Sequence, residues 1–341
     1  MRRVFTNKPY FIAEIGVNHN GNIKLAKKMI ISAIRSGADA VKFQTFKAET
    51  LVTPNTPKVK YQKTTTSKKE SHYEMIKSLE LSEKNHVLLK KFCEKKKIDF
   101  LSTPYDLNSA KYLSRIGCKV FKTASADIVD LEMHEYLAKK NKTVIISTGM
   151  SSFKEIDQCI NLYKKNLNKK FILLHCVSNY PCSTKSLNLK IIPEIKKRYN
   201  CQVGYSDHSI GSDAATLSYS LGARVFEKHF TTNKRLKGPD QKASALPDEF
   251  KEMVLKINNA EVILGKPIKK CQPEEIEMSK VSRKSLTLNK YLFKGQKIKK
   301  SYLTLKRPGT GLYYKDIKLI IGKKVKSNLR KNHQIKIRDI Y

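Results

Sequence analysis

The feature that most constrains the fold is a regular alternation of strand-like and helix-like segments between residues 10 and 265. Eight short runs are rich in β-branched and aromatic residues, and a helical pattern follows most of them. Repeated βα units are typical of a parallel sheet, and eight of them in this length match a closed (β/α)₈ barrel of about 250 residues. The runs are 10–18, 40–46, 99–104, 120–125, 143–149, 170–178, 202–209 and 224–230.

An open, doubly wound sheet is the alternative α/β architecture for such a pattern. That architecture commonly binds a dinucleotide through a GxGxxG turn after the first strand, and YFIAEIGVN (10–18) is followed by no such turn. We therefore predict the barrel, with a catalytic domain over residues 1–265.

The pattern changes after Gly265. Residues 266–281 have the composition of a linker, and residues 282–341 contain short strand-like pieces, RKSLTLN (283–289) and HQIKIRD (333–339). A module of roughly sixty residues is marginal alone. We predict a small separate C-terminal domain that docks on another surface.

The charge balance raises a rival function. The chain has 68 Lys plus Arg against 30 Asp plus Glu, a net charge of +38, which invites a nucleic-acid-binding interpretation. The basic residues are scattered in pairs and form no single arm, which favours a general surface charge that attracts anionic substrates. Binding that weakens steeply with salt would identify the rival class.

Cellular location follows from cysteines and apolar runs. The seven Cys include no CxxC motif, which favours a reducing cytoplasm over a disulfide framework. The start, MRRVFTNKPYFIAEIG, has basic residues before a short apolar run, but Glu14 interrupts that run and no small-residue cleavage site follows, so we expect no signal peptide. No stretch approaches the roughly 20 apolar residues of a membrane span. We expect a cytoplasmic protein without membrane association.

Polar residues gather at the carboxyl ends of the predicted strands, where (β/α)₈ barrels place their active sites. A single Ser, Thr or His in such a place is ordinarily a turn, cap or structural residue. Polar groups at all eight ends predict a shared site. They are Glu14 and Asn18; Lys42 and Gln44; Ser102 and Thr103; Lys122 and Ser125; Ser147 and Thr148; His175 and Ser178; Ser206 and His208; and Glu227 and His229.

Two lysines among these groups indicate an anion. The ammonium groups of Lys42 and Lys122 would repel each other in one cavity unless an anion lay between them. Two ammonium groups surrounded by serine hydroxyl groups can bind a phosphate or a carboxylate. The alternative is that both lysines extend to solvent.

Two histidines indicate a metal. His208 and His229 end neighbouring strands, so both imidazoles can bind one divalent cation with waters in the open positions. Glu14 on the first strand lies beside the last strand if the barrel closes, where its carboxylate could orient a water at the metal. The alternative is that the histidines are structural.

These stretches together resemble the sialic acid (N-acetylneuraminate) synthase family. They run in the family's order over nearly the whole chain, and GYSDH followed by EKHF and GPD is highly specific. The matching stretches are IAEIGVNHNG (12–21), GADAVKFQT (37–45), FLSTP (100–104), FKTAS (121–125), IISTGM (145–150), LLHCVSNYP (173–181), GYSDHS (204–209), FEKHF (226–230), KGPDQKAS (237–244) and KRPGTG (306–311).

The resemblance implies a (β/α)₈ barrel with a C-terminal antifreeze-like domain, and condensation of phosphoenolpyruvate with an N-acylated amino-hexose. It also implies a divalent cation, manganese or magnesium. Lys42, Thr103, Lys122, Ser125, Ser147 and Ser206 match phosphoenolpyruvate contacts; His208 and His229 match metal ligands; Glu14 matches the acidic residue beside them; Gln44, Tyr180, Glu227 and Asp240 match sugar contacts. Arg307 matches an arginine that reaches into the partner subunit's site, which implies a domain-swapped homodimer.

The identity of the sugar is less constrained. Ser178 stands where N-acetylneuraminate-forming members carry Asn, although serine can still donate to an anion. N-acetylmannosamine is the main expectation, and the alternative is a diacetamido-hexose that gives N,N'-diacetyllegionaminate. GPD argues against the pseudaminic acid branch. The C-terminal domain and GPD also disfavour a synthase of deoxy-heptulosonates, another barrel class that uses phosphoenolpyruvate.

Overall fold

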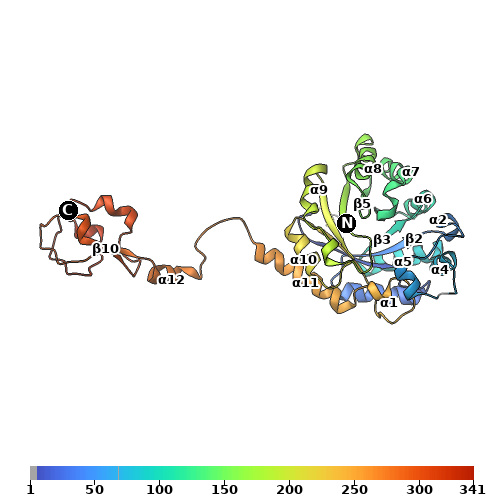
Figure 1. Ribbon diagram of the computed structural model, residues 1–341, viewed down its shortest axis with the longest axis horizontal. Coiled ribbons are helices and arrows are strands. Elements are labelled where there is room, and N and C mark those ends of the chain that lie inside the picture. Colours follow the sequence, from blue (N-terminus) through green and yellow to red (C-terminus); the bar gives the residue numbers. More distant parts are fainter. Residues whose placement is uncertain (1–5, 68) are drawn as a thin grey trace. The chain divides into compact units, whose positions relative to one another are not determined.

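The computed structural model describes residues 6–67 and 69–341 (Figure 1). The chain divides into two compact units, Met1–Gly265 and Lys266–Tyr341. The first five residues of the N-terminal stretch that was considered for a signal peptide lie outside the described residues. Among the residues described, no helix has the length and apolar character needed to cross a membrane.

The first unit is built on eight parallel strands, which confirms the predicted barrel. Their order is β3-β2-β1-β8-β7-β6-β5-β4, and β3 and β4 at the two ends of this row lie in contact, so the barrel is nearly closed. First and last strands are therefore neighbours, with Glu14 opposite His229 in the register. The strands are β1 Tyr10–Gly16, β2 Ala40–Thr45, β3 Asp99–Pro104, β4 Val120–Thr123, β5 Thr143–Ser147, β6 Phe171–Cys176, β7 Gln202–Asp207 and β8 Val225–His229.

Helices surround the strands in Figure 1, and local sequence signals start them. The Asn22 side chain accepts from the backbone N–H groups of Lys24 and Leu25 at the start of α1, and Ser152 forms a capping box with Glu155 at the start of α8. The surrounding helices are α1 Ile23–Arg35, α5 Glu83–Lys96, α6 Leu107–Arg115, α7 Leu131–Lys139, α8 Phe153–Lys165, α9 Ile191–Tyr199, α10 Asp213–Ser220 and α11 Pro247–Leu264.

The inside of the barrel is apolar at its base and polar at its mouth. Side chains alternate along a strand, so residues two apart share a face. On β1, buried Tyr10 and Ile12 are followed on the same face by Glu14, and on β8 Val225 is followed by Glu227. The apolar residues inside the base are Tyr10, Ile12, Ala40, Leu101, Val120, Ile145, Ile172, Leu174 and Val225. The site is thus the upper end of the inner face, resting on a packed layer.

The polar stretch after β2 contains more structure than the sequence pattern indicates. It forms α2 (Ala48–Leu51) and α3 (Lys60–Thr65), and α4 (His72–Ser78) follows. Thr65 Oγ1 donates to the Pro239 carbonyl at 3.2 Å, which ties α3 to the loop after β8. This contact joins residues 174 positions apart, and such a long-range tie leaves no local sequence signal.

The C-terminal unit has its own small core of aliphatic residues. Strand β9 (Ser285–Leu288) pairs antiparallel with β10 (Leu303–Lys306), and the 3₁₀ helices η5 (Lys300–Tyr302), η6 (Tyr314–Leu319) and η7 (Ile337–Asp339) complete it.

Two segments of this region differ in local structure from what their sequence pattern indicates. The predicted linker is partly helical, because α12 covers Glu275–Ser282. The piece HQIKIRD forms an isolated bridge from Gln334 to Thr287 of β9 and then η7, so it is not a full strand.

Candidate active site

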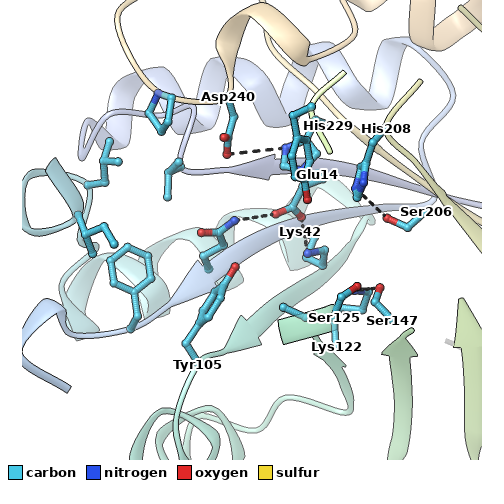
Figure 2. A pocket seen from close by; sticks show the side chains of 18 of the residues that line it. Glu14, Lys42, Tyr105, Lys122, Ser125, Ser147, Ser206, His208, His229 and Asp240 are labelled. Atoms are coloured by element: carbon cyan, nitrogen blue, oxygen red, sulfur yellow. Dashed lines mark hydrogen bonds and ion pairs between the residues drawn. The ribbon is translucent and has the colours of Figure 1, made fainter. Parts of the chain in front are cut away.

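A cavity of about 240 Å³ opens at the carboxyl ends of the strands (Figure 2). It brings together most of the residues that the strand-end pattern and the resemblance singled out. Those that line it are Glu14, Lys42, Gln44, Lys122, Ser125, Ser147, Tyr180, Ser206, His208, Glu227, His229 and Asp240.

Two lysines and two glutamates form the floor of the cavity. Lys42 Nζ lies 2.7 Å from Glu14 Oε2 and 3.7 Å from Glu227 Oε2, and Lys122 Nζ lies 3.5 Å from Glu227 Oε1. All four side chains are almost completely buried. The anion expected between the two ammonium groups is thus supplied by the protein itself, as the Glu227 carboxylate.

Hydroxyl groups complete the contacts of both lysines. Lys42 Nζ donates to Thr103 Oγ1 at 2.9 Å, so Thr103 supports the site from behind its ammonium group. Lys122 Nζ donates to Ser147 Oγ at 2.6 Å. Ser206 Oγ donates to Glu227 Oε1 at 2.9 Å. Each charge therefore has a defined position before any substrate enters, which reduces the reorganisation that binding requires.

The two carboxylates differ in proton affinity. Burial alone would raise the pKa of Glu227, but the attraction of Lys122 and Lys42 and the hydrogen bond from Ser206 hold that pKa below its usual value. Burial raises the pKa of Glu14, and the attraction of Lys42 offsets this only in part. Glu14 is therefore the carboxyl group that takes up a proton more readily.

The two imidazoles lie at the rim, with ring centroids 5.7 Å apart. His208 Nδ1 lies 2.7 Å from the Val177 carbonyl, to which it can only donate, so its Nε2 carries a lone pair. His229 Nδ1 is buried without a hydrogen-bond partner among residues 6–67 and 69–341, and lies 3.9 Å from Asp240 Oδ2. Burial lowers the pKa of His208 to about 4 and lowers the pKa of His229 as well.

Neutral imidazoles with an available ring nitrogen are suitable ligands for a divalent cation. Within the described part of the chain, no cluster of three or more His, Cys, Asp and Glu is arranged around a common metal position. Two imidazoles with water in the remaining positions fit an open site of the kind found in catalysis. The donor set on this rim thus fits the divalent cation that the resemblance implies.

A glycine packs against serine hydroxyls beside Lys122. The Gly149 N–H donates to Ser125 Oγ at 3.0 Å. A Cβ at Gly149 would lie 2.5 Å from Ser178 Oγ, 2.8 Å from Cys176 Sγ and 2.9 Å from Ser125 Oγ, so only glycine fits. Ser178 lines a neighbouring hollow of about 930 Å³, which shares Ser125 and Tyr180 with the cavity.

Arg307 lies in the C-terminal unit, directly after β10, and is exposed there. The barrel cavity does not include it. The other predicted site residues that do not line the cavity are Asn18, Ser102, Thr103, Thr148, His175 and Ser178. The role of Arg307 stays a prediction.

Aromatic residues form one wall of the cavity, and of these only Tyr180 was expected from the sequence. The Tyr180 ring lies 4.2 Å from the His208 ring and 5.4 Å from the Tyr61 ring, measured between centroids. Tyr105 points into the pocket in Figure 2. Tyr105 directly follows FLSTP, so a scan extended by one residue past the strand would have found it. Tyr61 lies on α3, and no local pattern marks it.

Comparison with known proteins gives two matching families. The NeuB family matches residues 29–269, and the SAF domain matches residues 283–340.

The relatives are similar over nearly the full length. The chain is 43% identical over 324 residues to the N,N'-diacetyllegionaminic acid synthase of Legionella pneumophila, covering 94% of this chain and 91% of that one. It is 33% identical over 324 residues to the human N-acetylneuraminate-9-phosphate synthase, covering 93% and 88%. The crystal structure of an N-acetylneuraminic acid synthetase from Leptospira borgpetersenii superposes with a TM-score of 0.72 at 36% identity, covering 80% and 90%.

Proposed function

Because the chain belongs to the NeuB family and ends in a SAF domain, we propose that it is a phosphoenolpyruvate-dependent nonulosonic acid synthase whose product is N,N'-diacetyllegionaminate. The observation that carries the proposal is the pair of buried lysines held beneath two neutral imidazoles in one cavity. The sequence alone favoured N-acetylmannosamine as acceptor. The higher identity to the Legionella pneumophila enzyme than to the human enzyme favours a diacetamido-hexose instead.

Phosphoenolpyruvate would be held by Lys42, Lys122 and the hydroxyls of Ser125 and Ser147. In the arrangement described, Glu227 bridges the two ammonium groups. An incoming anion competes with that carboxylate for the same donors. Its added negative charge also favours protonation of a neighbouring carboxyl group. Glu14 is the one whose pKa is already raised, so it would hold that proton.

His208 and His229 would hold the divalent cation, with Asp240 close to the ring of His229. When bound there, such a cation supplies a Lewis acid that polarises the sugar aldehyde. The Val177 carbonyl fixes the ring orientation of His208 and keeps the proton on its Nδ1.

The reaction joins C3 of phosphoenolpyruvate to the aldehyde carbon of the sugar, and water adds to C2. Glu14 would first give the proton that it holds to the aldehyde oxygen, which becomes a hydroxyl group, and its carboxylate would then accept one proton of that water. The proton of the new C2 hydroxyl leaves with phosphate, which leaves the ketone of the product. Lys42 and Lys122 balance the anionic charge throughout. Because they are buried and pre-positioned, their attraction is stronger than in water.

The resemblance also supports a homodimer, in which the partner subunit's Arg307 completes the site. Mass measurement in solution by light scattering tests this part. A monomer that remains fully active would contradict it.

The test of the function is release of inorganic phosphate by the purified chain with phosphoenolpyruvate, a divalent cation and an acceptor, with the nonulosonic acid identified by mass spectrometry. We expect turnover with the diacetamido-hexose to exceed that with N-acetylmannosamine. Lys122→Met should raise KM for phosphoenolpyruvate, since loss of one buried charged contact typically costs about 2–5 kcal/mol. Lys119→Met is the matched control, because Lys119 is exposed and its loss changes the net charge equally. If no phosphate is released with either acceptor, the proposal is contradicted.

A further inference from the structure

We propose that one side of the cavity is a subsite for an acetamido group of the acceptor, with its methyl group packed against an apolar wall formed by Val17 after β1 and by the segment after β2. The inference rests on the proposed function and names what distinguishes one acceptor from another. The wall consists of the side chains of Val17, Phe46, Leu51, Met75, Ile76 and Leu79, which line the same cavity as the lysines and imidazoles.

The wall is a cluster of its own and is separate from the barrel core. Val17, Phe46, Met75 and Leu79 are buried against one another, and Leu51, Ile76 and Tyr105 pack on them. The main core lies between strands and helices, and another cluster fills the base of the barrel. This apolar cluster therefore has a second role besides packing, because its members also line the cavity in which substrate would bind.

The wall suits a methyl group and disfavours a hydroxyl group. Carbon-only side chains gather on the side of the pocket away from His208 and Lys122 in Figure 2. A sugar hydroxyl directed there would lose its water partners and gain no others, which is unfavourable. A methyl group directed there would be stabilised by burial of its apolar surface.

Polar side chains that can bind an amide line the same cavity as the wall. The side-chain oxygen of Gln62 accepts from the Val59 N–H at 3.0 Å, which leaves its NH₂ group as a donor. Gln44 Nε2 donates to Glu14 Oε1 at 3.3 Å, which leaves its oxygen as an acceptor. The Tyr105 hydroxyl can serve as either. An acetamido group needs a donor for its carbonyl, an acceptor for its N–H and an apolar surface for its methyl, and the cavity supplies all three.

The position of the wall selects which acetamido group binds there. The aldehyde carbon must lie near the lysines and imidazoles, where phosphoenolpyruvate reacts. In Figure 2 the side chains made of carbon alone lie on the opposite side of the pocket. The substituent that reaches them is therefore the acetamido group farther from the aldehyde, which a diacetamido-hexose has and N-acetylmannosamine lacks.

The experiment compares three acceptors by kcat/KM in the phosphate-release assay. They are the diacetamido-hexose, its analogue with the distal acetamido group replaced by formamido, and N-acetylmannosamine. The formamido analogue keeps the amide and removes only the methyl. We expect the unaltered protein to prefer acetamido over formamido by about tenfold, the least that one carbon in an apolar pocket is worth.

Variants locate the preference. Leu79→Ala and Met75→Ala should each reduce the acetamido-to-formamido ratio to about threefold or less, because part of the apolar contact is gone. Met75→Gln keeps the size of the side chain and should reduce the ratio in the same way. It replaces Met75→Ala in the experiment if that variant folds poorly. Leu81→Ala is the matched control, since Leu81 is equally buried two residues from Leu79 but packs in the barrel core. It should lower thermal stability and leave the ratio unchanged.

Two outcomes would overturn the inference: a ratio near one in the unaltered protein, or an unchanged ratio in folded Leu79→Ala and Met75→Gln. In either case phosphate release continues, so the proposed function stands. Absence of phosphate release with all three acceptors would contradict the proposed function and the inference together.

Discussion

Replacement of Lys228 by methionine should destabilise the barrel strongly, although Lys228 faces away from the cavity. Lys228 Nζ lies 2.6 Å from Asp207 Oδ2 and donates to the Ser209 carbonyl at 2.7 Å, and the Asp207–Lys228 pair is almost completely buried. The pair joins β7 to β8 on the outer face. Its members alternate with His208 and His229, so it also holds the two imidazoles in register.

The magnitude follows from what the change leaves behind. Breaking a buried ion pair from one side costs about 3–5 kcal/mol, because the remaining charge is unpaired. In Lys228→Met, Asp207 Oδ1 still accepts from the Ser209 N–H at 2.9 Å and from the Ser209 hydroxyl at 2.6 Å. These two bonds place the expected loss at the lower end, about 3 kcal/mol. That loss corresponds to a decrease in Tm of about 6–12 °C.

Urea and thermal unfolding followed by far-ultraviolet circular dichroism would measure the effect. Lys256→Met is the control, because Lys256 is paired with Glu252 at 2.7 Å at the exposed surface, where such pairs contribute about 0–1 kcal/mol. The double variant Asp207→Asn with Lys228→Met should recover part of the loss, since no buried charge remains. A loss below about 1 kcal/mol in the single variant, within the range of exposed pairs, would refute the reasoning.

Three further predictions concern the site and the pH dependence of stability. His229→Ala should abolish metal-dependent phosphate release and weaken manganese binding in calorimetry; full activity of that variant with chelator present would refute the metal assignment. Gly149→Ala should raise KM for phosphoenolpyruvate, because the new methyl displaces the Ser125 hydroxyl, and an unchanged KM would argue against this role. Burial lowers the pKa of His134 to about 4, below its unfolded value, so the unfolded state binds more protons as the pH falls. Stability should thus decrease by about 2 kcal/mol from pH 6.5 to pH 5 through this group, and the urea midpoint of His134→Gln should vary less over that range.

Much of the site was predictable because parallel strands carry simple geometric information. A polar residue at the carboxyl end of a strand must lie at the mouth of the barrel, whatever the loops do. This is why Glu14, Lys42, Lys122, His208 and His229 could be assigned to one cavity before their distances were known. The metal and phosphoenolpyruvate roles then followed from the resemblance and stay proposals.

What the sequence determined by itself was the repeating βα pattern, the separate C-terminal module and the ring of polar strand ends. Each depends on local periodicity, which the chain carries in every segment. Only the tertiary structure decided that Glu227 bridges the two lysines and that residues of α2 to α4 line the cavity. These features depend on contacts between distant positions, such as that of Thr65 with Pro239, and local periodicity does not encode which distant segments meet.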